Sequence, residues 1–150
     1  MLKVNVARRT AVINEARQWL GTPYHHQASL KGVGCDCIGL IKGVGDAFGL
    51  MNIPDNAWTN IKRYSRRPNP VMMGNHLETY MDRISSPLIG DIAWIEWRQD
   101  LPMHLALVAE KNGVMTFIHA YSLVGKAVEV CVDDEWLGMV NSWWRYRGID

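Results

Sequence analysis

The first part of the chain carries hydrophobic residues at helical spacing. Between residues 10 and 20 an apolar position recurs every three or four residues, which is the pattern of an amphipathic helix. Gly21 and Pro23 then interrupt the pattern, because neither residue continues a helix well. We therefore expect a first helix over residues 10–20.

Two further segments have the same periodicity. The first runs from residue 37 to residue 50, and the second from residue 71 to about residue 84. Gly39, Gly43 and Gly45 lie inside the first of them, and each weakens a helix by up to ~1 kcal/mol relative to alanine. We interpret them as sites of close packing against a neighbour. The stretch 51–70 between these helices contains three prolines, and we expect an irregular surface segment there.

The second half of the chain changes character. Its hydrophobic segments are short, rich in β-branched and aromatic residues, and separated by turn-forming residues, which is typical of strands. The expected strands are 92–97, 104–110, 114–120, 126–132 and 143–147. Helices followed by strands predict an α+β fold with a mainly antiparallel sheet.

Composition and charge limit the number of domains and the classes of partner. With 150 residues, 48% of them hydrophobic, the chain has the size of one domain, 1–150. Its net charge of +1 provides no basic surplus to attract nucleic acid. No segment approaches the ~20 apolar residues of a membrane span, and the amino-terminal residues do not form a signal peptide. We expect synthesis in the cytoplasm.

The cysteines offer the clearest chemistry. There are three, Cys35, Cys37 and Cys131, an odd number that does not suggest a disulfide framework. Cys37 stands where a glycine-rich loop meets the second expected helix. The positive end of a helix dipole favours a thiolate, so Cys37 is a candidate nucleophile that we expect to be activated and readily alkylated. Cys35 is expected to be structural.

Two histidines lie on neighbouring expected strands. A turn at 111–113 would pair these strands and bring His104 close to His119. A helix packed on that face of the sheet would then present Cys37 to His104. In this arrangement His104 takes the thiol proton and His119 orients the imidazole. Tyr24 could add a hydroxyl donor to backbone oxyanion donors around Cys37.

A metal site is a different interpretation of the same residues. Cys35, Cys37, His104 and His119 are ligand types that suit zinc. However, the C-x-C spacing differs from the usual C-x2-C knuckle, and the asymmetric arrangement fits catalysis better.

Five motifs in order resemble the NlpC/P60 family of cell-wall cysteine peptidases. They are Trp19-Leu20-Gly21-Thr22-Pro23-Tyr24, Asp36-Cys37-Ile38-Gly39-Leu40, Gly90-Asp91-Ile92, His104-Leu105-Ala106-Leu107-Val108 and Ile118-His119-Ala120. The resemblance implies a papain-like α+β core, with helices packed on a mainly antiparallel sheet of about five to six strands. It also implies that Cys37 is the nucleophile, His104 the base and His119 the third polar residue, with Tyr24 lining the site.

The activity implied by this resemblance is hydrolysis of peptidoglycan stem peptides. The family commonly cleaves the bond between D-γ-glutamate and diaminopimelate, through a thioester that here would form on Cys37. No metal or organic cofactor is implied. Ile38 departs from the pattern, because many members carry serine there, which leaves the substrate contacts open. Asp36 remains and could receive a substrate amine.

The segment 27–37 resembles a narrower, phage-associated branch found in tail gene clusters, including those of gene transfer agents. This resemblance implies an enzyme carried in a virion tail, with tail-hub or tail-tip partners, that opens the cell wall or acts in the periplasm during DNA delivery. The alternative is a catalytically silent structural component of the tail with the same fold.

Overall fold

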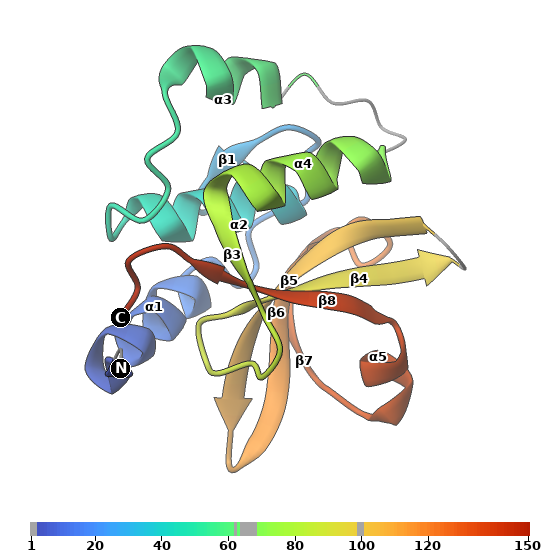
Figure 1. Cartoon of the computed structure of the whole chain (residues 1–150). Coiled ribbons are helices and arrows are strands. Elements are labelled where there is room, and N and C mark those ends of the chain that lie inside the picture. The colour runs from blue at the N-terminus through green and yellow to red at the C-terminus, as the bar shows by residue number, and fades with distance from the viewer. Residues whose placement is uncertain (1–2, 62, 64–68, 99–100) are drawn as a thin grey trace.

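The computed structural model describes residues 3–61, 63, 69–98 and 101–150 (Figure 1). The helices are α1 (Val6–Arg17), α2 (Cys37–Asp46), α3 (Asp55–Ile61), α4 (Pro70–Tyr80) and α5 (Asp134–Gly138). The strands are β1 (Ser29–Leu30), β2 (Gly34–Cys35), β3 (Met81–Ile84), β4 (Ile92–Arg98), β5 (Leu101–Lys111), β6 (Val114–Tyr121), β7 (Lys126–Cys131) and β8 (Val140–Tyr146). None of the helices within these described ranges is long and apolar enough to cross a membrane.

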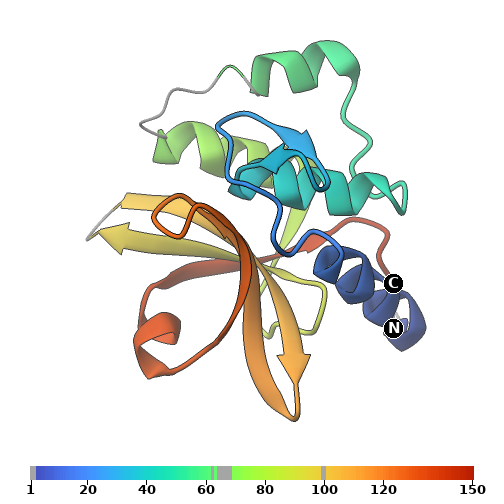
Figure 2. The same ribbon diagram turned by 180° about the vertical axis from the view of Figure 1, so that it is seen from behind.

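A six-stranded antiparallel sheet forms the centre of the molecule. Its strand order is β3-β8-β4-β5-β6-β7, and β1 and β2 form a separate two-stranded sheet. Helices α1, α2 and α4 lie on one side of the twisted main sheet, and α3 lies beyond α2 and α4 (Figures 1 and 2). This architecture confirms the expected α+β fold with a mainly antiparallel sheet.

The predicted elements differ from the observed ones mainly at their ends. Helix α1 begins earlier than expected, because the side chain of Asn5 accepts the backbone N–H of Arg8 and caps it. Helix α4 ends at Tyr80, since the next four residues pair with β8 as strand β3. Part of the segment 51–70 forms α3 and was wrongly expected to be irregular. Residues 62 and 64–68 of that segment lie outside the described residues.

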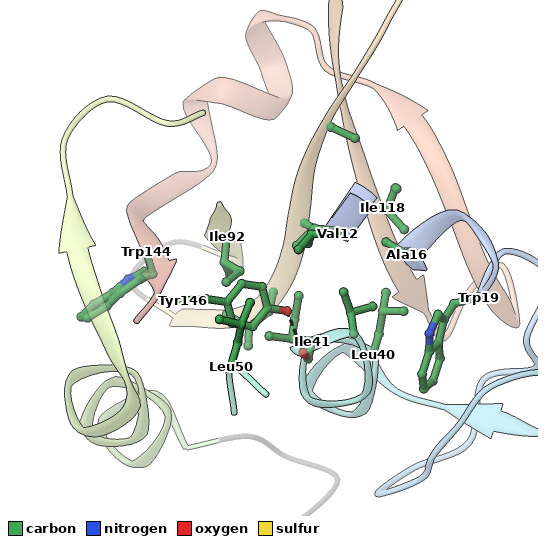
Figure 3. Close-up of a cluster of buried hydrophobic side chains, with 14 of the residues drawn as sticks. Val12, Ala16, Trp19, Leu40, Ile41, Leu50, Ile92, Ile118, Trp144 and Tyr146 are labelled. Carbon is green, nitrogen blue, oxygen red and sulfur yellow. Dashed lines mark hydrogen bonds between the residues drawn. The ribbon is translucent and has the colours of Figure 1, made fainter. Parts of the chain in front are cut away.

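The larger hydrophobic core lies between helices α1 and α2 and the sheet (Figure 3). Val12 and Leu40 from the helices are fully buried there, together with Ile118 from β6. Tyr146 on β8 is almost fully buried, and its hydroxyl donates a hydrogen bond of 2.7 Å to the carbonyl oxygen of Ile41. This bond ties α2 to the far side of the sheet and satisfies a buried hydroxyl.

Glycines allow α2 to pack unusually close to its neighbours. A Cβ atom at Gly39 would lie 1.8 Å from the carbonyl oxygen of Ala28, and one at Gly43 would lie 2.2 Å from the ring of Trp19. No real side chain tolerates such distances. The glycines predicted to mark close packing therefore do so, and they fix the position of the helix that begins at Cys37.

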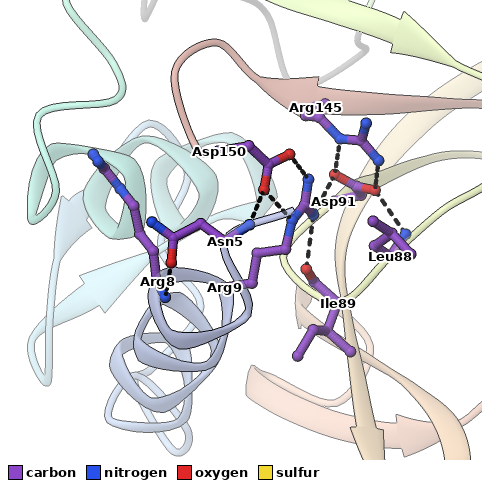
Figure 4. Close-up of polar contacts among 8 residues, drawn as sticks. All are labelled: Asn5, Arg8, Arg9, Leu88, Ile89, Asp91, Arg145 and Asp150. Carbon is purple, nitrogen blue, oxygen red and sulfur yellow. Dashed lines mark hydrogen bonds and ion pairs between the residues drawn. The ribbon is translucent and has the colours of Figure 1, made fainter. Parts of the chain in front are cut away.

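A buried ionic network joins the two ends of the chain (Figure 4). The Asp91 carboxylate is fully buried and pairs with Arg9 on α1 at 3.0 Å and with Arg145 on β8 at 2.8 Å. Arg9 also pairs with Asp150 at 2.7 Å. The backbone N–H of Leu88 donates a hydrogen bond of 2.7 Å to Oδ2 of Asp91, the oxygen that also pairs with Arg145. Every charge in the network therefore has a partner of opposite sign.

Replacing Asp91 by alanine should destabilise the fold strongly. The substitution leaves Arg9 partly uncompensated inside the protein, which costs about 3 to 5 kcal/mol for a buried pair. Asp82→Ala is the matched control, since it removes an exposed pair with Arg147 that contributes about 1 kcal/mol or less. Urea unfolding measures both, and equal losses at Asp91 and Asp82 would contradict the role given to the network.

Candidate active site

Cys37 is the first residue of α2, as the sequence predicts. The preceding Asp36 caps the helix: one carboxylate oxygen accepts the backbone N–H of Gly39 and the other accepts that of Gln27, both at 2.8 Å. These bonds hold the loop against the end of the helix and so fix the direction in which the Cys37 side chain points from the backbone. Asp36 is thus a structural cap, and the expected contact with a substrate amine stays a prediction.

The two histidines predicted to work together are in direct contact. His104 on β5 and His119 on β6 are almost fully buried, and Nε2 of His104 lies 2.7 Å from Nδ1 of His119. The hairpin at Asn112 and Gly113 positions them, with both residues at positive φ as this tight turn requires. The predicted juxtaposition of the imidazoles is therefore confirmed.

The sheet presents these histidines on a different face from the one expected. Helices α1 and α2 pack on the face that carries Leu105, Leu107 and Ile118, whereas His119 contacts Trp136 of α5, which packs on the opposite face. The prediction that α2 covers the histidine face was wrong. The alternation of side chains along the strands assigned residues to the two faces of the sheet correctly. The sequence did not reveal that α5 would cover the face with the histidines.

The backbone of Leu105 links the thiol to the histidine strand. On one side, Leu105 pairs with β4. On its other side, the pairing of β5 with β6 begins only two residues later, at Leu107. The Leu105 backbone forms a hydrogen bond that favours the Cys37 thiolate. Leu105 directly follows His104, so this contact brings the Cys37 side chain to the strand that carries His104.

The electrostatics of the thiol differ from the sequence-based expectation. Burial, together with the neighbouring Asp36 carboxylate, raises the pKa of Cys37 to about 12. Hydrogen bonds with the backbone of Leu105, Ile38 and Cys37 itself act in the opposite direction without overcoming burial. In the free protein the thiol is thus protonated, and attack on a carbonyl requires simultaneous transfer of its proton to a base.

Burial also keeps both imidazoles neutral. It lowers the pKa of His119 to about 4, and burial together with the neighbouring His119 lowers the pKa of His104 well below its ordinary value. Neutral imidazole is the form that accepts a proton. The three side chains therefore form a neutral thiol and a neutral base, rather than the ion pair expected from the helix dipole.

Three aromatic rings that the motifs did not identify surround the histidines. Trp97 lies 5.0 Å from the ring of His104 and stacks on Tyr121 at 5.0 Å. Tyr121 stacks on His119 at 5.5 Å, and Trp136 meets His119 edge-on at 5.4 Å. Strand alternation could have placed Tyr121 beside His119, since the two are two residues apart on β6.

The other predicted site residues lie near Cys37. Tyr24 and Ile38 pack against the same core cluster as Cys37. The Tyr24 backbone forms a bridge to Cys35, and its side chain lines a surface cleft with His25 and His26. The structure therefore brings both residues to the expected part of the molecule, and their contacts with substrate stay predictions.

The structure does not form the alternative zinc site. Across the described residues, which include all four proposed ligands, no three His, Cys, Asp or Glu side chains are grouped so as to hold a metal ion. Cys35 is instead fully buried in the main core, and burial raises the pKa of its thiol to about 12. This location agrees with its expected structural role.

Solved structures with this fold include several NlpC/P60 proteins. A lipoprotein-like NLP/P60 protein from Staphylococcus aureus superposes with a TM-score of 0.62 at 18% identity, covering 97% of this chain and 43% of its own. The NlpC/P60 domain of the peptidoglycan hydrolase SagA gives a TM-score of 0.54 at 18% identity, covering 90% and 96%. The chain thus spans less than half of the staphylococcal protein and nearly all of the SagA domain.

An amidase structure is similar as well. An N-acetylmuramoyl-L-alanine amidase from Bacteroides uniformis gives a TM-score of 0.60 at 12% identity, covering 94% of this chain and 99% of its own. No protein-family model matches the sequence, and no curated protein matches it. At these identities the likeness concerns the fold: the chain has the α+β architecture found in NlpC/P60 domains.

The buried histidines should make stability depend on pH. The unfolded chain binds a proton at His119 near its ordinary pKa of 6.5, whereas the folded chain does so only near 4. The free energy of unfolding should therefore fall as pH drops between these values, by about 1.4 kcal/mol per unit for this group. His119→Asn should reduce the slope and His25→Asn, at an exposed position, should not. Urea titrations at several pH values test this, and an unchanged slope in His119→Asn would refute it.

The cysteines should differ in reactivity. Cys131 is exposed, whereas burial raises the pKa of the other two thiols. With iodoacetamide at pH 7, Cys131 should react first, and labelling of Cys37 should accelerate as pH rises, because the thiolate is the reactive form. Peptide mass spectrometry gives the order. Faster labelling of Cys37 than of Cys131 at pH 7 would indicate an activated thiolate instead.

Proposed function

We propose that this protein is a cysteine peptidase that hydrolyses peptidoglycan. The observation that carries the proposal is the buried pair of His104 and His119, 2.7 Å apart. The backbone of Leu105, the residue after His104, also forms a hydrogen bond with the cysteine at the start of α2. The fold is shared with the NlpC/P60 domain of a peptidoglycan hydrolase and with an amidase. A nucleophile, a base and an orienting group on this fold together support a cell-wall hydrolase.

The histidine contact sets the tautomer that the reaction needs. When His104 donates its Nε2–H to Nδ1 of His119, Nδ1 of His104 keeps a lone pair and can accept the thiol proton. His119 then carries its proton on Nε2, a buried atom that has no hydrogen-bond partner among the described residues. The aromatic rings around the pair exclude water, so the proton has few competing acceptors.

The proposed reaction has two steps. The Cys37 sulfur attacks the scissile carbonyl while its proton passes to Nδ1 of His104, and backbone N–H groups at the start of α2 stabilise the oxyanion. His104 then gives this proton to the leaving amine, which leaves a thioester on Cys37. Water, deprotonated by His104, hydrolyses the thioester and restores the thiol.

The bond we propose is the one between D-γ-glutamate and diaminopimelate in the stem peptide. Support for this choice comes from the sequence motifs around Cys37 and His104, which resemble peptidases that cleave there. The amidase with the same fold makes the bond between the sugar and the peptide the natural competitor. Mass spectrometry of released muropeptides distinguishes them, because only the amidase reaction separates the entire peptide from the glycan.

Carriage in a phage-type tail is part of the proposal. Its support is the resemblance of segment 27–37 to tail-associated enzymes. Tail-hub or tail-tip proteins are the corresponding partners, and the periplasm or cell wall is the place of action. Proteomic analysis of purified tail particles should find this chain in fixed proportion to the tail proteins, and its absence from such particles would refute this part.

Digestion of purified peptidoglycan tests the activity. The wild-type chain should release muropeptides, Cys37→Ala should release none, and His104→Ala should be about 100- to 10,000-fold slower, as expected for the loss of a general base. Cys131→Ala is the control, since that thiol is exposed and lies far from Cys37 in the sequence. Equal release by wild type and Cys37→Ala would exclude Cys37 as the nucleophile. Inactivity of a folded wild-type chain would favour the structural tail component.

A further inference from the structure

Five aromatic rings form one cluster that contains the histidine pair. Trp97 on β4 has its ring centre 5.0 Å from that of His104, 5.0 Å from that of Tyr121 and 5.2 Å from that of Trp136. His119 is the fifth ring, and its centre lies 6.4 Å from that of Trp97. Trp97 is therefore in contact with all four of the other rings, although none of the motifs that point to catalysis includes it.

An irregularity in the sheet carries the Trp97 ring. The ladder between β4 and β5 pairs Ile95 with His104, and its register then shifts twice. Along the described pairs, the ladder passes from Glu96 to Arg98 without a partner for Trp97. Bulges of this kind re-aim side chains and are frequent beside active sites. The ring of Trp97 therefore reaches His104, although Ile95 is the residue directly opposite that histidine.

Across the described part of the chain, no acidic side chain pairs with the two histidines. The ion pairs found there include neither His104 nor His119. Asp134 and Glu135 on α5, the helix that packs against the pair, are exposed. Burial and the neighbouring His119 both lower the pKa of His104. When His104 takes the proton of Cys37, the buried positive charge therefore needs another source of stabilisation.

The face of an aromatic ring can supply this stabilisation. Its π-electrons attract a cation within about 6 Å of the ring centre, most strongly for tryptophan and where water is excluded. Among the tryptophan and tyrosine rings of the described residues, only Trp97 lies within that distance of His104, since Tyr121 is 6.3 Å away. The planes of Trp97 and His104 meet at 40°, whereas Trp136 meets His119 edge-on at 79°. Trp97 is therefore the ring best placed to act on a protonated His104.

Two neighbouring rings hold Trp97 in this orientation. Tyr121 stacks on it with an angle of 14° between the planes, and Trp136 packs against it at 64°. These contacts come from β6 and from α5, so the half-buried indole is held from two elements of the fold. A group that is already oriented stabilises a developing charge without having to reorganise.

We propose that Trp97 is a positioning residue for the proposed reaction, whose ring stabilises the His104 imidazolium that forms when Cys37 transfers its proton. This inference rests on the proposed peptidase function and adds a residue that lies outside the motifs indicating that function. The proton moves from the sulfur to Nδ1 of His104 and then to the leaving amine, and the indole gains and loses nothing. Its contribution is electrostatic and is largest while the imidazole is charged.

Fluorinated tryptophans at position 97 test this effect on turnover. Fluorine withdraws electrons from the ring face and changes the ring's shape little, so adding fluorine atoms one by one weakens the attraction in steps. On a soluble muropeptide, kcat/KM should fall with each fluorine, by about 3- to 30-fold in total. The acid limb of its pH profile should move to lower pH, because the imidazolium becomes less stable. The same series at Trp144, which is buried in the larger core, should change neither. A kcat/KM that is independent of fluorination at position 97, or that falls equally at Trp144, would overturn the inference.

Histidine titrations test the contact without catalysis. In the Cys37→Ala protein with ¹³C-labelled histidine, NMR resonances follow protonation of the histidine pair. Each fluorine at position 97 should lower the pKa of the pair, and fluorine at Trp144 should leave it unchanged. A pKa that does not respond to fluorination at position 97 would overturn the inference, even if the wild type is an active peptidase. If the pKa responds but the wild type releases no muropeptide, the proposed function fails while the contact between Trp97 and the imidazolium stands.

Discussion

The close packing of α2 is the constraint on which the rest of the structure depends. Its backbone approaches Ala28 and the ring of Trp19 so closely that Gly39 and Gly43 cannot carry a side chain. On the opposite side, the Tyr146 hydroxyl holds the Ile41 carbonyl. Because interiors tolerate almost no overlap, these contacts fix the helix within a fraction of an ångström. Cys37, the proposed nucleophile, is the first residue of this helix, so the same contacts fix the position of its backbone.

Burial has opposite chemical effects on the two halves of the candidate site. It raises the pKa of the Cys37 thiol and lowers the pKa values of His104 and His119. Both groups therefore rest in their neutral forms, which avoids two desolvated charges in the free protein. In the proposed reaction, charge arises only when the thiol proton moves to the imidazole, and the backbone N–H groups at the start of α2 would stabilise the oxyanion.

Different elements of the fold surround different parts of the candidate site. The sheet and α5 enclose the histidines in aromatic rings, and the Cys37 thiol at the start of α2 is hydrogen-bonded to the backbone of Leu105 on β5. The loop after α2, together with α3 and α4, lines an apolar pocket.

Local sequence determined much of this protein. The periodicities of 3.6 and 2 located α2 and the strands β4 to β8, because they reflect which residues face the core. Motif order identified Cys37, His104 and His119 as candidates, and the tight turn at Asn112 and Gly113 fixed the pairing of the two histidine strands. Each of these features depends on residues close together in the chain.

Only the tertiary structure decided the environment of those residues. The dipole argument predicted a thiolate at Cys37, but burial by distant segments reversed the direction of its pKa. The sequence also did not reveal that Trp97, Tyr121 and Trp136 surround the histidine pair, or that α3 would form in a segment with three prolines. Desolvation and enclosure depend on which remote parts of the chain meet, so no local pattern encodes them.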